Sequence, residues 1–343
     1  MTTLVVDWLG RGGIAQTAEA WALELSYAGE PVVVATRAGR ELADTSLPTV
    51  LADARGGRLR THARLVRTVC RAIRDLRPDT VVLQNYLVAP MEEPVHRAAR
   101  TVGARVVVVV HDQQHHTRTS GVRTGLRHQL RKADVVVAHT HFVAHSVAEW
   151  AGRPVDDVLP LPVPLGVLDA PRPAEAPVVR NGQPIALHLG VLTRADNKGT
   201  DLVVDLAARG VPGWELAFAG VGAPAVPGAT SVDRFLTTGE LAATIDAADA
   251  MLLPYRFASQ SGVVPIAQAL GALPVVTAVG GLPEQVEDGV TGVVLPEGAG
   301  VEELAAALRE LDEPAREAIA AKAKVVVWDH HADFAAKVRR LSA

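Results

Sequence analysis

The run Arg105–Val110, with the sequence RVVVVV, restricts what this chain can fold into more than any other segment. Continuous β-branched residues predict a strand, and a strand that is apolar on both sides needs cover on both faces of its sheet. Parallel sheets provide that cover, because helices connect their strands. His111 and Asp112 follow the run, at the strand end where open α/β sheets place ligands. We therefore expect α/β layers with a polar site after this strand.

The same order of strand, loop and helix recurs on both sides of the valine run. At the start of the chain, Leu4–Trp8 predicts a strand, Gly10–Gly13 a glycine loop and Ile14–Ala28 an amphipathic helix. Further strands are expected at 31–36, 80–84, 133–138, 185–189, 215–219, 251–254 and 274–277, and a short strand or turn at 231–236. Further helices are expected at 58–76, 141–150, 200–209, 240–247, 264–270, 301–311 and 314–327. This alternation is typical of doubly wound parallel sheets.

With 343 residues, the chain is longer than one compact core usually reaches and suits two domains. The segment 159–177 contains LPLPVP and DAPRPAEAP, and its prolines and few apolar residues predict a linker. We therefore expect an N-terminal domain over 1–168 and a C-terminal domain over 175–327. An amphipathic tail over 328–343 completes the chain.

Composition excludes several classes of protein. The net charge of −4 and a pI near 6.3 give no bulk attraction to nucleic acid or to an anionic membrane. The arginines of 58–76 then predict a solvated face, with a partner or membrane patch as the alternative. Cys70 is the only cysteine, which excludes a disulfide within the chain. No apolar run reaches the roughly 20 residues of a spanning helix, and we expect a cytoplasmic chain without a transmembrane segment.

The loop Ser259–Val263 is rich in small residues and opens the expected helix 264–270. A helix start presents unpaired backbone N–H groups and the positive end of a dipole, which together bind phosphate. An ordinary connection between strand and helix is the alternative, since many such loops bind nothing. The loop therefore predicts an anion site that needs support from other residues.

The longer stretch 255–295 resembles the donor-binding segment of retaining glycosyltransferases of family 4, which have the GT-B fold. The resemblance lies in the serine-glycine loop, the following helix, the strand PVVT and the run GGLPEQVEDGVTG. It implies two Rossmann-like, doubly wound domains that face each other across a cleft, with a C-terminal tail that packs back on the first domain. It also implies a nucleotide-sugar donor on the second domain and the acceptor on the first.

The activity implied by the resemblance is transfer of a hexosyl or related group from a nucleotide-diphosphate donor to an acceptor hydroxyl, with retained anomeric configuration. Neither a cofactor nor a metal is expected, and nucleic acid is not an expected partner. A small-molecule or glycolipid acceptor in bacterial natural-product or glycoconjugate biosynthesis suits the modest first domain. The family usually has two glutamates where this chain has Ser259 and Ala267. A nucleotide-sugar-binding protein without turnover, or a GT-B epimerase or phosphorylase, is therefore the alternative.

The resemblance assigns site residues one by one. In the loop Gly190–Gly199, Arg194 and Lys198 match the basic pair that neutralises the leaving diphosphate, and His111 matches a histidine that faces the transferred sugar. The full expected donor set is Gly13, Arg194, Lys198, Arg234, Phe235, Ser259, Gln260, Ser261, Gly262 and Val263. The expected acceptor side is Gly12, Gly13, Asp112 and His139.

Two other interpretations of His111 stay open. It could be a structural histidine with satisfied hydrogen bonds, or it could belong to a metal site with Asp112, His115 and His116, because histidines four apart are a known ligand spacing. We rank sugar contact first, the structural role second and the metal third. In the tail, His330 and His331 are expected to be exposed.

Overall fold

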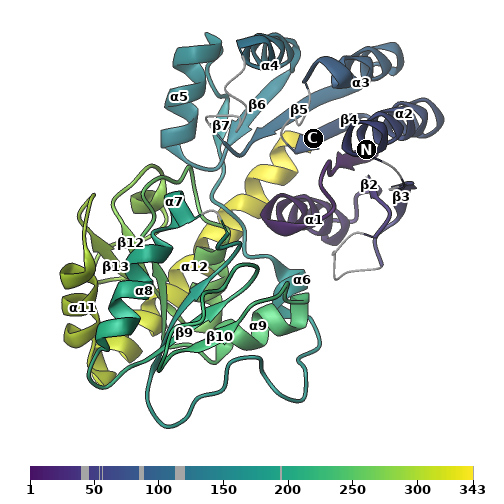
Figure 1. Ribbon diagram of the computed structural model, residues 1–343. Coiled ribbons are helices and arrows are strands. Elements are labelled where there is room, and N and C mark those ends of the chain that lie inside the picture. The colour runs from purple at the N-terminus through teal and green to yellow at the C-terminus, as the bar shows by residue number, and fades with distance from the viewer. Residues whose placement is uncertain are drawn as a thin grey trace. The chain divides into compact units, whose positions relative to one another are not determined.

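The computed structural model describes residues 1–39, 46–53, 55, 57–84, 89–112, 120–193 and 195–342. The chain divides into two compact units, each described here by itself (Figure 1). Unit 1 comprises Met1–Gly166 and His331–Ala343, and unit 2 comprises Val167–His330. The chain therefore passes into unit 2 near the expected linker, and it returns inside the last helix, α12 (Glu313–Ser342).

Unit 1 is built on a seven-stranded parallel sheet with the order β3-β2-β1-β4-β5-β6-β7. The valine run is β5, which pairs with β4 on one side and β6 on the other, and its residues 106–110 are buried. This central position confirms what its β-branched residues predict. The strands are β1 (Thr3–Val6), β2 (Val32–Arg37), β3 (Thr49–Ala52), β4 (Thr80–Gln84), β5 (Arg105–Val110), β6 (Val135–Ala138) and β7 (Asp157–Val158).

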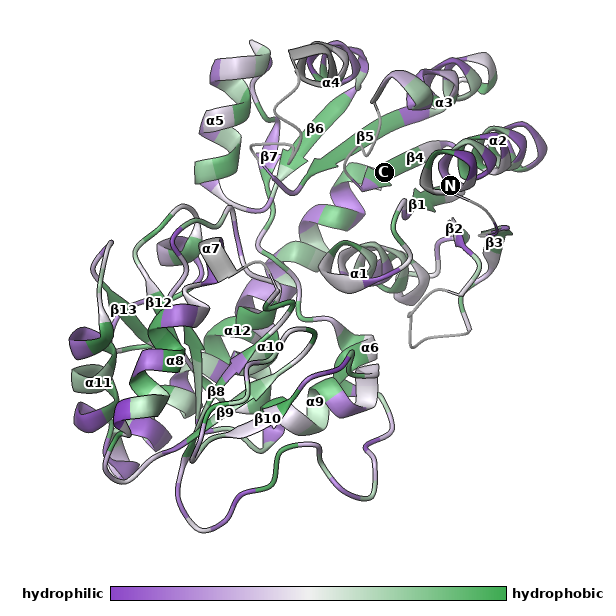
Figure 2. Cartoon of the chain, in the orientation of Figure 1, coloured by the Kyte–Doolittle hydropathy of each residue, from purple (hydrophilic) through white to green (hydrophobic). Residues whose placement is uncertain are grey.

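Helices cover both faces of this sheet, as its apolar strands require (Figure 2). One face packs on α2 (Arg58–Leu76), α3 (Ala89–Val102), α4 (Ser120–Lys132) and α5 (His141–Ala151). The other face packs on α1 (Gly12–Tyr27) and the end of α12, where the rings of Trp21 and Phe334 meet edge to face at 5.9 Å. The short helix α6 (Leu165–Leu168) lies where the chain leaves the unit.

Unit 2 repeats the architecture with a six-stranded parallel sheet in the order β10-β9-β8-β11-β12-β13. Its strands are β8 (Ile185–Leu189), β9 (Glu215–Ala219), β10 (Thr230–Val232), β11 (Ala250–Leu253), β12 (Leu273–Thr277) and β13 (Val293–Leu295). Its helices are α7 (Ala195–Lys198), α8 (Thr200–Arg209), α9 (Thr238–Asp246), α10 (Val263–Leu270), a 3₁₀ turn (Leu282–Glu284) and α11 (Val301–Glu310).

The structure differs from the sequence prediction at several elements. The expected loop after β8 contains the single-turn helix α7, and the two expected C-terminal helical segments form one continuous helix, α12. The strands β3, β7 and β13 and the helices α3 and α4 had no prediction. α3 contains Pro94, which breaks the helical pattern on which sequence reading depends.

His331 is a clear correction, because it is buried and not exposed. Its Nδ1 accepts the backbone N–H of Val163 at 3.2 Å, which leaves the proton on Nε2, 3.1 Å from the Glu24 carboxylate. The side chain therefore fastens α12 to helix α1 and to the segment that leads out of unit 1. Its neighbour His330 is exposed as expected.

Each sheet reverses its strand order at one point, and open α/β sheets bind ligands beside such a point. In unit 1 the reversal lies between β1 and β4, and in unit 2 between β8 and β11. The glycine loop 10–13 follows β1, whereas the loops 190–199 and 254–262 follow β8 and β11. The topology therefore brings predicted site residues to both reversal points. No helix in the described ranges combines the length and apolarity needed to span a bilayer.

Candidate functional site

Glycines make the loops after β8 and β9 of unit 2 approach each other closely. A Cβ on Gly220, which has φ +116°, would lie 2.0 Å from the carbonyl oxygen of Gly190. A Cβ on Gly190 itself would lie 2.7 Å from the Nζ of Lys198. The backbone at the end of β8 therefore carries no side chain, and the ammonium group of Lys198 lies close to it.

Lys198 reaches this place from the end of α7. Its Nζ donates to the hydroxyl of Tyr255 at 3.2 Å and lies 4.8 Å from the centre of that ring. In the part of the chain that the structure describes, Lys198 pairs with no carboxylate. The ammonium group can therefore serve an anionic ligand. Its predicted companion, Arg194, lies outside the described residues.

The backbone around Lys198 is fixed from both sides. Gly199 has φ +64°, and a Cβ there would lie 2.1 Å from the carbonyl oxygen of Pro254. Arg256 donates its backbone N–H to the Asn197 carbonyl at 2.8 Å, and its guanidinium pairs with Asp201. That guanidinium holds the pKa of Asp201 below its usual value. Arg256 is thus neutralised, and Lys198 is not.

The loop Ser259–Val263 has a clamp that the sequence did not reveal. The side-chain amide of Gln285 accepts the Ser261 N–H at 2.7 Å and donates to the Ser261 carbonyl at 3.1 Å. The Ser261 N–H is therefore taken, which corrects the expectation that it is open to an anion. The N–H groups of Gly262 and Val263, at the start of α10, donate to no acceptor in the described structure. These two groups can bind an anion.

Position 267 lies on the core side of α10. Ala267 is fully buried in the apolar cluster that contains Ile245 and Met251. A helix turns by about 100° per residue, so its neighbour Gln268 faces elsewhere. The Gln268 amide donates to the carbonyls of Gln285 and Thr291, at 3.2 and 3.4 Å. A glutamate at 267 would therefore be buried among apolar side chains, and we expect it to destabilise unit 2.

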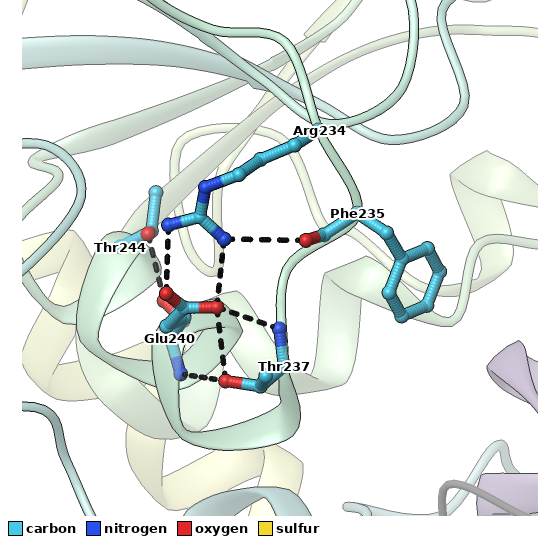
Figure 3. Close-up of polar contacts among 5 residues, drawn as sticks. All are labelled: Arg234, Phe235, Thr237, Glu240 and Thr244. Atoms are coloured by element: carbon cyan, nitrogen blue, oxygen red, sulfur yellow. Dashed lines mark hydrogen bonds and ion pairs between the residues drawn. The ribbon is translucent and has the colours of Figure 1, made fainter.

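Arg234 and Phe235, at the end of β10, behave differently from each other (Figure 3). The guanidinium of Arg234 forms two hydrogen bonds with the Glu240 carboxylate, at 2.7 and 2.9 Å. Arg234 and the Thr237 N–H lower the pKa of Glu240 to about 2. The Phe235 ring points away from this pair and is 53% exposed. The ring is therefore open to contact, whereas the arginine is committed to Glu240.

His188 lies inside β8 and has a structural role. Its Nδ1 donates to the Leu252 carbonyl at 2.8 Å, and its Nε2 accepts the Thr200 hydroxyl at 3.0 Å. Burial lowers its pKa to about 4, so the ring is neutral and can make both bonds. The bonds join β8, β11 and α8 just below Lys198. The pattern of apolar residues in β8 gave no sign of this contact.

The glycine loop of unit 1 is shaped by Asp7. Its carboxylate accepts the N–H groups of Leu9 and Gly10 and the Thr36 hydroxyl, at 2.8 to 3.0 Å. Burial raises the pKa of Asp7 in spite of these bonds. Gly12 has φ +67°, as a tight turn requires, and nothing lies within 4 Å of a Cβ built on Gly12 or Gly13. Packing within the chain therefore does not explain the glycine at 13, which is exposed at the start of α1.

His111, His139 and Gln84 come together after three neighbouring strands, β5, β6 and β4. The Nε2 of His111 lies 2.8 Å from Gln84 Oε1, and the rings of His111 and His139 are 5.1 Å apart. The Nδ1 of His139 donates to the Leu159 carbonyl at 3.0 Å. Burial holds the pKa of His111 well below its usual value and lowers that of His139 to about 4. Both rings are therefore neutral.

A neutral histidine pair can hydrogen-bond hydroxyl groups but does not attract phosphate. Within the described part of unit 1, the buried Nε2 atoms of His139 and Gln84 have no hydrogen-bond partner. With the proton of His139 on Nδ1, its Nε2 is an acceptor, and the Gln84 amide nitrogen is a donor. A hydroxyl group can donate a hydrogen bond to the His139 nitrogen and accept one from the Gln84 amide.

The residues that the metal interpretation of His111 names are described only in part. Among the described residues, no group of three or more histidine, cysteine, aspartate or glutamate side chains is arranged to hold a metal ion. Asp112 is half-buried beside His111, whereas His115 and His116 lie outside the described residues. The Gln84 contact also gives His111 a hydrogen-bond partner within unit 1.

The structure thus groups the predicted residues by unit. In unit 2, Lys198 and the loop 259–263 follow the neighbouring strands β8 and β11, and Arg234 and Phe235 follow β10. In unit 1, His111, His139 and Asp112 follow β5 and β6, and Gly12 and Gly13 follow β1. Tyr255, Gln285 and Gln84 were not predicted. Of these three, only Gln84 could have been predicted from the sequence, because it is a polar residue at the end of an apolar strand.

Comparisons with known proteins agree with this arrangement. Residues 183–313 match the family described as Glycosyl transferases group 1. The matched stretch lies within unit 2. A comparison with curated proteins gave no match.

Several solved structures resemble the whole chain. HepE of Anabaena, in complex with UDP and glucose, is 17% identical with a TM-score of 0.72, and the match covers 99% of this chain and 98% of HepE. Sucrose-phosphate synthase from Thermosynechococcus elongatus is 16% identical with a TM-score of 0.76, covering 99% and 98%. WaaG, a glycosyltransferase involved in lipopolysaccharide biosynthesis, is 17% identical with a TM-score of 0.69, covering 100% and 98%. At these identities the likeness shows the fold, and the fold is GT-B, as the sequence predicted.

Proposed function

We propose that this protein is a glycosyltransferase that moves a sugar from a nucleotide-diphosphate donor to an acceptor hydroxyl. The observation that carries the proposal is Lys198, which pairs with no carboxylate in the described structure. It lies against the Gly190 backbone, in a segment that matches a glycosyltransferase family. The N–H groups of Gly262 and Val263 lie at the same edge of the sheet, after the neighbouring strand. Together they offer fixed positive charge without a metal.

The chemistry follows from the charge that develops during transfer. The departing nucleoside diphosphate gains negative charge as the bond to the sugar breaks, and fixed donors that face this charge lower the barrier. Lys198 and the start of α10 supply such donors, and Arg194 is the proposed second cation. The exposed Phe235 ring suits a nucleobase, since aromatic faces stack. We propose that no metal takes part.

On unit 1, the neutral His111 and His139 suit sugar and acceptor hydroxyls. We propose that His111 contacts the transferred sugar and that His139 and Asp112 belong to the acceptor side. Retention of configuration, a hexose as the transferred sugar and an acceptor hydroxyl in bacterial natural-product or glycoconjugate biosynthesis rest on the resemblance. A cytoplasmic location stays a prediction.

The first test is a calorimetric titration of the protein with UDP, GDP, dTDP and ADP, with and without a chelator. We expect micromolar to millimolar binding of at least one nucleotide, unchanged by the chelator. Product formation from the matching nucleotide sugar is then followed by NMR, where a retained anomeric configuration is expected. Binding of none of the four nucleotides would contradict the donor site, and an inverted product would contradict the mechanism.

A second candidate function is nucleotide-sugar binding without turnover. It is favoured by Ser259 and Ala267, which stand where related enzymes have glutamates that hold the sugar and the ribose. The same titration distinguishes the two, because this candidate predicts donor binding with neither transfer nor hydrolysis. The epimerase alternative predicts conversion of the nucleotide sugar without an acceptor, and the phosphorylase alternative predicts that a sugar phosphate forms from a glycoside and inorganic phosphate.

A further inference from the structure

Helix α2 of unit 1 carries a straight line of arginines on its outer side. We call Arg60, Arg64, Arg67, Arg71 and Arg74 the arginine stripe. Their spacing of four, three, four and three residues places them within an arc of about 80° along about 21 Å of helix. The opposite side of α2, with Leu65, Val69 and Ile73, is buried in the core. The exposed side of α2 is thus mainly cationic, and its buried side is mainly apolar, with Thr61 and His62 as its buried polar residues.

Among the described residues, most of the charge of the stripe has no acidic partner. Arg60, Arg67, Arg71 and Arg74 are exposed, and none of them pairs with an acid in the described part of unit 1. Only the half-buried Arg64 has an acidic neighbour, Asp53, at 3.9 Å. Arginines without partners at this density repel one another, and an external anionic partner relieves that repulsion.

The neighbouring helices extend the stripe sideways. α2 packs beside α3 and α3 beside α4, on the same face of the sheet. The three helices together contain 12 lysines and arginines against three acids. Exposed members on α3 and α4 are Arg97, Arg100, Arg127 and Arg131. The result is a broad basic face, about 20 Å in each direction from the usual spacing of packed helices.

Charge is also divided unevenly along the chain. Unit 1 contains 23 lysines and arginines against 17 acids, a formal charge of +6, and unit 2 contains 11 against 21, a formal charge of −10. The total of −4 conceals this division, which is why composition favoured a solvated face for the arginines of 58–76. The balancing acids belong to unit 2. Screening at physiological salt acts over about 8 Å, so the local charge of a face decides what it attracts.

We propose that the basic face of α2, α3 and α4 binds the surface of an anionic lipid bilayer. Its breadth over three helices fits a plane of headgroups better than a single polyanionic strand. The exposed large apolar residues of these helices are Leu59 and Leu76, so the described part of the face offers no aromatic side chain on which nucleobases can stack. Because the apolar side of α2 is buried in the protein, this contact is electrostatic and does not require insertion.

This binding would hold the protein on a membrane where a lipid-linked acceptor is presented. The proposal does not depend on the donor chemistry of unit 2, because the basic face lies on unit 1. Each basic residue near an anionic surface raises partitioning by roughly fivefold. The contact should weaken steeply as salt is added.

The test is co-sedimentation of the full chain with vesicles of phosphatidylcholine that contain 0 or 30% phosphatidylglycerol. The variant Arg67→Gln/Arg71→Gln/Arg74→Gln removes three charges from the stripe. The control Arg309→Gln/Lys322→Gln/Lys324→Gln removes three exposed charges from unit 2. Glutamine supports helices about as well as arginine does, so neither variant should unfold its helix.

We expect the wild type and the control to bind the anionic vesicles and to leave them in 0.5 M salt, whereas the stripe variant binds about 100-fold more weakly. Equal binding by the stripe variant and the wild type would overturn the proposal, and so would equal binding to vesicles without anionic lipid. Binding to heparin or to a DNA oligonucleotide, with none to vesicles, would assign the face to a free polyanion instead. Nucleotide titration of both variants shows whether the donor site is intact, so a failure of either proposal is seen separately.

Discussion

The two units have the same architecture and opposite chemistry. Each has a parallel sheet that reverses its order at one point and carries predicted site residues at its strand ends. In unit 2 these residues are tightly packed glycines and Lys198, a cation that pairs with no carboxylate in the described structure. In unit 1 the glycine loop 10–13 follows β1 at the reversal point, whereas His111 and His139 follow β5 and β6 and are neutral and buried. In both units the strand ends carry the predicted site residues, and the loops that follow the strands determine whether those residues are charged or neutral.

Charge separates the units in a second way. Unit 2 is acidic overall but keeps a cation at the strand ends, whereas unit 1 is basic overall but has neutral groups there. The local groups at each site thus do not follow the overall charge of the unit. We infer that the charge of each unit acts on large partners and the strand-end groups act on small ligands.

The largest expected effect concerns the glycines. Gly220→Ala places a methyl group against the Gly190 carbonyl at a φ of +116°, so we expect a loss of more than about 3 kcal/mol of unfolding free energy. Gly13→Ala adds a methyl group in open space within α1 and should be neutral or stabilising by up to about 1 kcal/mol. Chemical denaturation measures both.

Measuring the transfer activity of Gly13→Ala separates a stability effect from a ligand-binding effect. If Gly13→Ala is stable but loses turnover, a ligand approaches the backbone of α1, as the acceptor-side prediction requires. Equal destabilisation by the two substitutions would show that the close approach of the loops in unit 2 does not set its glycines apart.

The next effect concerns Lys198. Lys198→Met removes a charge that faces the proposed diphosphate, and kcat/KM should fall by about 100- to 1000-fold, as when one donor to a developing charge is lost. In unit 1, His139→Gln removes a neutral contact, and we expect only about a 2- to 10-fold loss. Lys322→Met, at an exposed site on α12, is the matched control and should keep the wild-type rate. A larger loss from His139→Gln than from Lys198→Met would reverse the assignment of chemistry to the units.

Sequence reasoning recovered the parts of this picture that depend on local pattern. The valine run predicted β5 as a central strand, and apolar periodicity gave the helix at 58–76 to the residue. The glycine loops 10–13 and 190–199 followed from local pattern, whereas Lys198 was assigned through the resemblance to a family motif. The separation of charge between the units was hidden, since a total of −4 says nothing about where the charges lie.

Contacts between distant segments could not be predicted. Gln285 clamps Ser261 across 24 residues, and His331 binds Glu24 across 307. In both cases the sequence shows only a polar residue in a helical or turn segment. For Ala267, the match to a family motif gave a position in the binding segment but did not reveal that the side chain faces the core. The pairing of Arg234, a member of the expected donor set, with Glu240 was not predicted either.

A pH effect of intermediate size follows from the buried histidines. Burial lowers the pKa of His96 and His139 in unit 1, and of His188 in unit 2, to about 4. The unfolded chain takes up these protons near pH 6.5 and the folded chain only near pH 4, so stability falls as pH is lowered between these values. Each group costs up to about 2 kcal/mol at pH 5.

Unit 1 also contains His111, whose pKa burial holds well below its usual value, and we expect unit 1 to be the more acid-sensitive unit. Hydrogen exchange measured by mass spectrometry at pH 7 and pH 5 reports each unit separately, after correction for the intrinsic pH dependence of exchange. His139→Gln should flatten the pH dependence in unit 1 and leave unit 2 unchanged, and His188→Gln should do the reverse. Equal loss of protection in both units would show that these histidines do not set the difference.

The smallest effect concerns the surface pair of unit 2 in Figure 3. Glu240 caps α9 through Thr237 and also binds Arg234, whereas Glu303 caps α11 through the Gly300 N–H at 2.9 Å without an arginine. Glutamine retains the capping geometry but loses the charge. Glu240→Gln should therefore lower Tm by about 1–2 °C more than Glu303→Gln at pH 7, since exposed pairs contribute little.

This difference has a defined pH window. The pKa of Glu240 is lowered to about 2, so its charge stabilises the folded state above the ordinary value near 4.5, and the contribution disappears as pH falls toward 2. Differential scanning calorimetry of both variants at pH 7 and pH 3 measures the change. A gap of the same size at both pH values would mean that the pair contributes through packing and not through charge. Arg234 could then be released to a ligand at little cost, and its place in the donor site would need to be reconsidered.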